Sequence, residues 1–138
     1  MLFRSTSLNL EVILRKALER LDEMHGKEPS RDRVNDRVER LIQYAVMDRE
    51  QKDAFLLFAR IRNEFVHNLE VCTMRRALVN VGIKPETFLL KYPPNLKKTE
   101  EEGLVNAFIY LTAALRDSLV SLVARTKEKI EEFNRAQG

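Results

Sequence analysis

The sequence predicts an all-α protein in which four to five helices form one bundle. Apolar residues recur at intervals of three and four along most of the chain, which is the period of an amphipathic helix. Glycine and proline, four of each among 138 residues, fall mainly between these periodic segments. Charged residues make up 33% and apolar residues 44%, a mixture typical of a folded helical domain. We therefore expect residues 1–138 to form a single domain.

The first expected helix runs from about Leu8 to Met24. One face of it is apolar and consists of Leu10, Ile13, Leu14, Ala17, Leu18, Leu21 and Met24. Gly26 and Pro29 follow and favour termination of the helix. His25 has no ligand-type neighbour nearby in the sequence, so we expect it to be an exposed residue at the helix end.

The second expected helix runs from about Asp32 to Ala45. Its apolar face consists of Val34, Val38, Leu41, Ile42 and Ala45. The polar side mixes arginines with acids, namely Arg31, Arg33, Arg37 and Arg40 with Asp32, Asp36 and Glu39. An arginine patch for RNA is one interpretation. The interleaved acids favour the other, a solvated face whose charges pair with one another.

The third expected helix begins near Asp48, a suitable N-terminal cap, and continues to about Leu69. At about 100° per residue, six apolar residues share one face: Ala54, Leu57, Phe58, Ile61, Phe65 and Leu69. Phe55, Ala59 and Val66 widen this apolar arc to more than half of the circumference. Such a helix is expected to lie buried between other helices.

The remaining chain predicts shorter elements and one long helix. We expect a short helical turn over residues 71–82, a short helix from Pro85 to Leu90 and a loop at Tyr92–Asn95. The last helix begins at the capping sequence Thr99–Glu102 and extends to about Arg135. At about 1.5 Å per residue it would exceed about 50 Å, so either it kinks or its far end packs on a second subunit.

The composition argues against several classes of protein. A formal net charge of +3 and a pI near 9.1 permit contact with a polyanion without requiring it. Cys72 is the single cysteine, so no intramolecular disulfide can form, and with only two distant histidines there is no zinc-site pattern. We expect neither a metal nor a cofactor.

The sequence also argues against secretion and membrane insertion. The N-terminal segment lacks a long apolar stretch and a small-residue cleavage site. The most apolar window, Leu104–Ala124, contains Arg116 and Asp117 near its middle, and charge there makes insertion costly. We expect a cytoplasmic protein.

One short motif, Arg62–His67 with the sequence RNEFVH, gathers groups capable of chemistry. A histidine transfers protons near neutral pH, and an arginine binds phosphate through two parallel hydrogen bonds. On one ideal helix Arg62 and His67 lie about 140° apart around the axis. If both serve one site, that site must lie at the helix end or between two copies of the helix.

This motif resembles the R-N-x-x-x-H form found in the HEPN superfamily of all-α bundles, which includes toxin ribonucleases such as the HepT-like proteins. The phrase Ile61–His67, with the sequence IRNEFVH, is most similar to the mannitol operon repressor (MltR)-like branch. The resemblance implies a HEPN-like bundle with a long C-terminal helix that forms a homodimer. The close match covers about seven residues, and the order of helices extends it over Leu8–Leu90.

The resemblance also implies roles for three residues. In the nuclease members the residues that match Arg62 and His67 act in metal-independent RNA cleavage, and Asn63 matches a polar residue that helps to hold the site. We therefore expect a metal-independent endoribonuclease, toxin-like in character, with catalytic residues Arg62, Asn63 and His67. RNA would be its target, and an antitoxin or regulatory protein would be its partner.

The alternative is a non-catalytic MltR-like transcriptional regulator or protein-interaction module with the motif at its dimer interface. Glu64 places a negative charge inside the motif, and Leu69 stands where HepT-like toxins often carry a tyrosine. The sequence contains no evident helix-turn-helix with an exposed basic recognition helix, so DNA binding is not expected. In the enzyme Arg62 and His67 must be accessible to RNA, whereas the regulator allows them to be buried.

Overall fold

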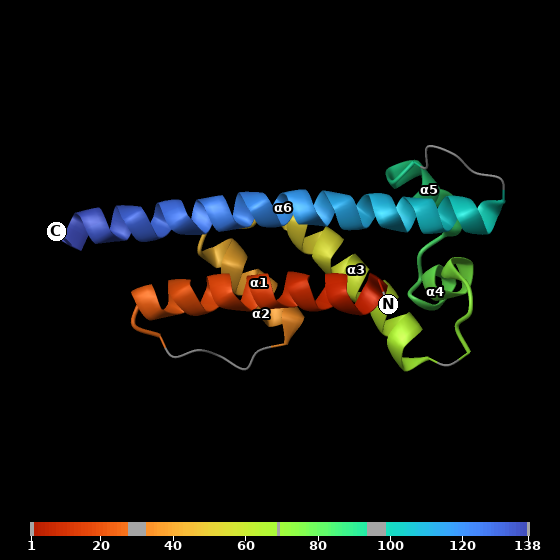
Figure 1. The fold of residues 1–138 in the computed structure, drawn as a ribbon, viewed down its shortest axis with the longest axis horizontal. Coiled ribbons are helices and arrows are strands. Elements are labelled where there is room, and N and C mark those ends of the chain that lie inside the picture. The colour runs from red at the N-terminus through yellow and green to blue at the C-terminus, as the bar shows by residue number, and fades with distance from the viewer. Residues whose placement is uncertain (1, 28–32, 69, 94–98, 138) are drawn as a thin grey trace. The chain divides into compact units, whose positions relative to one another are not determined.

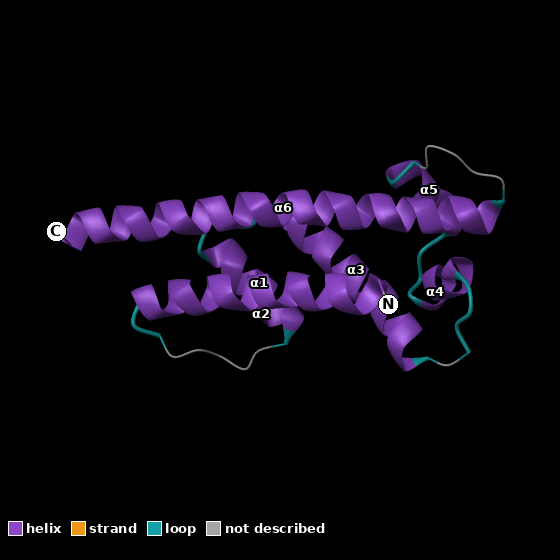
Figure 2. Cartoon of the chain, viewed as in Figure 1, coloured by secondary structure: helices purple, strands orange, loops and turns teal. Residues whose placement is uncertain are grey.

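The computed structural model describes residues 2–27, 33–68, 70–93 and 99–137, which form six helices and no strand (Figure 2). In chain order these are α1 (Leu2–Met24), α2 (Val34–Gln43), α3 (Arg49–His67), α4 (Met74–Asn80), α5 (Pro85–Lys91) and α6 (Glu100–Gln137) (Figure 1). The predicted all-α class and long C-terminal helix are confirmed. The structure has more helices than the expected four to five because the segment predicted as a short helical turn forms α4.

The chain divides into two compact units. The first consists of residues 1–56 and 116–138, and the second of residues 57–115, so α3 and α6 each contribute to both. In the first unit α1 packs against α2, and its buried apolar residues include Leu10, Leu14, Leu18, Leu21, Val38, Leu41, Val46, Phe55, Leu119 and Leu122. In the second unit α4 packs against α5, and the buried residues include Phe58, Ile61, Met74, Leu78, Phe88, Leu104, Phe108 and Leu111. That residues 1–138 act as one domain stays a prediction.

The expected capping residues lie at the starts of the helices. Asp48 Oδ1 accepts a hydrogen bond from the Gln51 amide at 2.8 Å, and Gln51 Oε1 accepts one from the Asp48 amide at 3.0 Å. This reciprocal pair satisfies backbone donors that have no partner inside α3. Thr99 Oγ1 likewise accepts from the Glu102 amide at 3.2 Å where α6 begins. Pro85 occupies the first turn of α5 as expected.

Several helix boundaries differ from the sequence prediction. Helix α1 begins before the expected Leu8, and α3 ends at His67. Helix α2 ends at Gln43, so Ala45 lies beyond it with a φ of 62° and is exposed rather than part of the apolar face. Several residues of the sequence prediction lie outside the described ranges, namely Pro29, Arg31, Asp32, Leu69, Pro94 and Asn95.

Helix α6 is uninterrupted over 38 residues, which corresponds to about 57 Å at about 1.5 Å per residue. Among the described helices it is the one long and apolar enough to cross a membrane by length and composition. The core helix of a soluble protein passes the same test, and one third of the apolar window is buried here. Its exposed side chains include apolar residues, such as Ile109 and Val120, as well as Arg116 and Asp117.

Candidate functional site

The motif lies in the last turns of α3, within the second unit. The chain turns directly after His67 because Asn68 organises the next residues. Its side-chain Oδ1 accepts from the Glu70 amide and its backbone oxygen accepts from the Val71 amide, both at 3.1 Å. An asparagine that bonds to a nearby backbone amide offers the chain an alternative to helix continuation. The histidine is therefore the final helical residue.

Arg62 and Asn63 are in direct contact. The guanidinium donates to Asn63 Oδ1 through Nη2 at 2.9 Å and through Nε at 3.2 Å. Arg62 is half-buried and Asn63 is exposed. An amide oxygen carries no formal charge, and this contact orients the guanidinium. The pair fits an arginine positioned to receive an anion.

The His67 side chain is exposed at the end of α3 and forms no hydrogen bond or ion pair with another residue that the structure describes. It follows Arg62 by five residues of continuous helix, which separates the two by about 140° around the axis and about 7.5 Å along it. The backbone positions of Arg62 and His67 therefore diverge, although Asn63, which accepts from the guanidinium, lies one turn before His67 and about 40° from it around the axis.

Glu64, the acid inside the motif, joins α3 to the end of α4. Its Oε2 accepts from Asn80 Nδ2 at 3.1 Å and from Asn68 Nδ2 at 3.2 Å. Arg60 also donates to the backbone oxygen of Val81, just after α4. The negative charge within the motif thus has a structural partner, which the sequence alone did not indicate.

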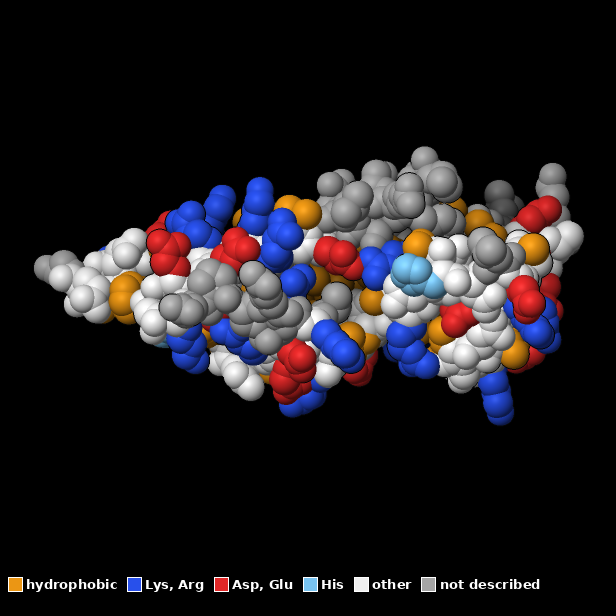
Figure 3. Space-filling view, turned by 90° about the horizontal axis from the view of Figure 1, so that it is seen from below, with side chains coloured by type: hydrophobic (Ala, Val, Ile, Leu, Met, Phe, Trp, Pro, Cys, Tyr) orange, Lys and Arg blue, Asp and Glu red, His pale blue; other side chains and the backbone are white. Residues whose placement is uncertain are grey.

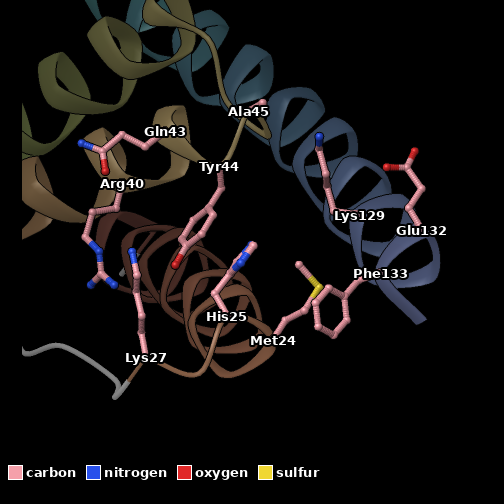
Figure 4. A pocket seen from close by; sticks show the side chains of 10 residues that line it. All are labelled: Met24, His25, Lys27, Arg40, Gln43, Tyr44, Ala45, Lys129, Glu132 and Phe133. Atoms are coloured by element: carbon pink, nitrogen blue, oxygen red, sulfur yellow. The ribbon is translucent and has the colours of Figure 1, made fainter. Parts of the chain in front are cut away.

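A separate groove lies in the first unit, where the ends of α1, α2 and α6 meet (Figure 4). It has a volume of about 720 Å³. Its lining consists of Met24, His25, Lys27, Arg40, Gln43, Tyr44, Ala45, Lys129, Glu132 and Phe133. No local sequence pattern indicates this groove, because its residues come from three distant segments. His25 is exposed at the end of α1 as predicted.

Three aromatic rings cluster in the groove. The His25 and Tyr44 rings stack with centroids 5.1 Å apart and an interplanar angle of 13°. Phe133 meets His25 edge-on at 6.2 Å. The Lys27 ammonium lies 5.8 Å from the centre of the Tyr44 ring, a cation–π geometry. Figure 4 shows His25 between Tyr44 and Phe133.

A buried carboxylate behind the groove fixes two of its lining residues. Asp22 is 1% exposed, and its Oδ1 accepts from Arg40 Nη2 and from Tyr44 Oη, the latter at 2.6 Å. Burial and this hydrogen bond to Asp22 raise the pKa of the Tyr44 hydroxyl. Asp22 Oδ2 is also buried and has no hydrogen-bond partner among the residues described.

Some of the charged side chains of α2 form ion pairs with residues of other helices and not with one another. Arg40 pairs with Asp22 of α1, and Glu39 pairs with Lys52 and Arg49 of α3. Figure 3 shows acidic side chains among the basic ones on the face in view. Among the described residues, no cluster of three or more His, Cys, Asp or Glu side chains could hold a metal ion.

Comparison of the chain with models of protein families, with curated proteins and with solved structures found no match. The resemblance of the motif to the HEPN superfamily therefore stays a prediction.

Proposed function

We propose that the protein is a metal-independent endoribonuclease whose site forms from the α3 motifs of two copies of the chain. The observation that carries this proposal is the exposure of His67 at a helix end, together with a guanidinium that Asn63 orients. The imidazole is accessible to a polyanion, as a nuclease requires of the group that transfers protons. Asn63 is the positioning residue.

The reaction uses the 2′-hydroxyl of the RNA as the nucleophile. His67 accepts the 2′-hydroxyl proton while the 2′-oxygen bonds to the adjacent phosphorus, and the bond from phosphorus to the 5′-oxygen breaks. A water molecule from the solvent donates a proton to the leaving 5′-oxygen, so each site uses one histidine. Arg62 binds the non-bridging phosphate oxygens and offsets the charge that grows on them. The products are a 2′,3′-cyclic phosphate and a 5′-hydroxyl.

Two copies are proposed because Arg62 and His67 of one α3 diverge by about 140°. When two copies of α3 meet about a two-fold axis, the arginine of one copy and the histidine of the other face the same phosphate. Val66, beside His67, is 42% exposed, so an apolar side chain is accessible for such a contact.

RNA cleavage in EDTA tests the proposal. We expect purified wild type to cleave, and His67→Ala and Arg62→Ala each to lose at least about 100-fold in rate while remaining folded and dimeric. Arg76→Ala is the matched control, since it removes an exposed arginine of the second unit that lies outside the motif, and it should retain activity. No cleavage by the wild type, or an equal loss in the control, would contradict the proposal.

A mixing experiment tests the shared site. If each site takes Arg62 from one copy and His67 from the other, the inactive variants complement each other when mixed. Random exchange makes half of the dimers mixed, each with one intact site of two, so about a quarter of the wild-type activity returns. Absence of complementation after verified subunit exchange would show that the site is not shared in this way.

The second candidate is a non-catalytic regulator or interaction module that uses the motif as its dimer interface. The exposed apolar side chain of Val66 within the motif favours it. This function predicts a wild type that does not cleave RNA, and a Val66→Asp variant that becomes monomeric at unchanged helical content. A dimer that survives Val66→Asp would contradict it.

A further inference from the structure

We propose that the groove of the first unit binds a planar aromatic phosphate, of which a mononucleotide is the simplest example. The ligand would be either a free nucleotide or one nucleotide unit of an RNA strand. The proposal concerns residues separate from the α3 motif and does not depend on RNA cleavage. It rests on three properties of the groove: its rings, its charges and its anchored floor.

The rings offer a surface for stacking. His25 is exposed, and Tyr44 and Phe133 are half-buried, so all three rings are partly accessible. The stack of His25 on Tyr44 already shows that a planar ring lies favourably against this tyrosine. Stacking on aromatic side chains is how proteins hold bases without reading their sequence.

The charges favour an anion. Three cations line the groove, Lys27, Arg40 and Lys129, against one acid, Glu132. The buried Asp22 offsets much of the Arg40 charge. Lys27 and Lys129 form no ion pair with another residue of the described chain, so their ammonium groups are accessible to a phosphate. A ligand with both a ring and a phosphate would use both properties of the lining.

The floor of the groove is held in place before any ligand arrives. Asp22 fixes the Arg40 guanidinium and the Tyr44 hydroxyl through the same oxygen. A group already held by a buried partner loses little freedom when a ligand binds. The volume of about 720 Å³ lies within the range typical of small-molecule sites. These features distinguish the groove from an ordinary surface depression between helix ends.

Calorimetric titration with AMP, adenosine and inorganic phosphate tests the site. We expect AMP to bind more tightly than either part alone. Lys129→Gln should weaken AMP binding about tenfold, the effect of losing one charge-assisted hydrogen bond. Lys127→Gln is the matched control because Lys127 is an exposed lysine of the same helix that does not line the groove, and it should change the affinity less than about twofold.

His25→Ala separates stacking from charge, because it removes an exposed ring without taking a side chain from the core. It should weaken AMP binding more than phosphate binding. A pentanucleotide with 2′-O-methyl groups, which has no 2′-hydroxyl for cleavage, identifies the source of the ligand. If Lys129→Gln weakens binding of the pentanucleotide, tighter binding of the pentanucleotide than of AMP indicates an RNA strand, and the reverse indicates a free nucleotide.

Two results would overturn the proposal. One is the absence of saturable binding of both AMP and the pentanucleotide at ligand concentrations up to about 1 mM. The other is an equal effect of Lys129→Gln and Lys127→Gln on AMP affinity, which would place the bound phosphate elsewhere. These readouts measure binding alone. Absence of AMP binding would therefore not contradict RNA cleavage by the α3 motif, and absence of RNA cleavage would not contradict AMP binding in the groove.

Discussion

The groove and the α3 motif each hold an arginine and a histidine, but they hold the arginine in opposite ways. Arg40 binds a carboxylate that is 1% exposed, whereas Arg62 binds the amide oxygen of exposed Asn63. The first arginine is fixed by a buried charge, and the second is oriented by a neutral acceptor. An arginine fixed by a buried carboxylate suits the wall of a binding site, while one oriented by an amide suits the stabilisation of a developing phosphate charge.

The largest expected effect comes from removing the carboxylate that supports the groove. Asp22→Ala leaves the partly buried Arg40 guanidinium and the Tyr44 hydroxyl without their acceptor, and we expect a loss of about 3 kcal/mol in the free energy of unfolding. Asn63→Ala removes the corresponding acceptor of the motif, where water replaces it, and should cost less than about 0.5 kcal/mol. Urea denaturation followed by circular dichroism measures both values.

Asp22→Asn refines this test because it keeps the size of the side chain and one acceptor oxygen while removing the charge. The free energy of unfolding of Asp22→Asn should lie between the values for Asp22→Ala and wild type. An equal loss of unfolding free energy in Asp22→Ala and Asn63→Ala would mean that the acceptors of Arg40 and Arg62 contribute equally to stability, which would contradict the difference between the two regions.

A smaller effect is expected from the hydroxyl that shares Asp22. Tyr44→Phe keeps the ring and removes a hydrogen bond to a charged acceptor, which should cost about 1.5 kcal/mol at neutral pH. Because burial and Asp22 raise the pKa of Tyr44 in the folded state, its contribution is fully present below the unfolded pKa of about 10. This contribution to stability is lost as the pH rises through the higher pKa that Tyr44 has in the folded protein.

The matched control is Tyr110→Phe, since the Tyr110 side chain of the second unit is 52% exposed. Denaturation curves at several values between neutral and alkaline pH should show the advantage of wild type over Tyr44→Phe shrinking, while Tyr110→Phe stays parallel to wild type. A constant difference across this range would show that ionisation of Tyr44 is not coupled to folding.

Local signals in the sequence predicted most of the fold. Asp48 and Thr99 bond to amides within the next three residues, and Gly26 and Gly82 adopt the positive φ that ends α1 and α4. Each of these features depends on residues that are close together in the chain, so a local sequence pattern can predict it. The end of α2 was predicted less well because Ala45, a good helix former, occupies a position that usually carries glycine.

The candidate site was predictable only where it is contiguous. Arg62, Asn63 and His67 lie within six residues, and the regular helix then fixes their relative directions. The pairing of Asp22 with Arg40 joins residues 18 positions apart on two helices, and no local pattern encodes it. The groove depends on the packing of three helix ends, which is decided by tertiary contacts.

The residues that follow α2 and α4 both have a positive φ, and substituting them tests how much a side chain costs in that conformation. Ala45 follows α2 with φ 62° and Gly82 follows α4 with φ 81°. A side chain strains this conformation by about 1 kcal/mol, so Ala45→Gly should stabilise the protein and Gly82→Ala should destabilise it by similar amounts. A Cβ added at Gly82 meets no atom within 4 Å, so backbone strain alone decides the result. Changes of the same sign in thermal denaturation would contradict this account.

The smallest effect concerns Glu39, whose ion pairs with Lys52 and Arg49 are less covered than the pair behind the groove. The hydrogen bond from Lys52 lowers the pKa of Glu39, with the charges of Lys52 and Arg49 assisting and burial opposing. The stabilisation is therefore present above about pH 4.5 and is lost as the pH falls through the lowered pKa of Glu39 in the folded protein.

Wild type should be slightly more stable than Glu39→Gln at neutral pH, and this difference in stability should disappear in acid. Glu131→Gln, at an exposed acid of α6, should show no such convergence. A gap that persists in strong acid would mean that the contact, and not the charge, joins α2 to α3.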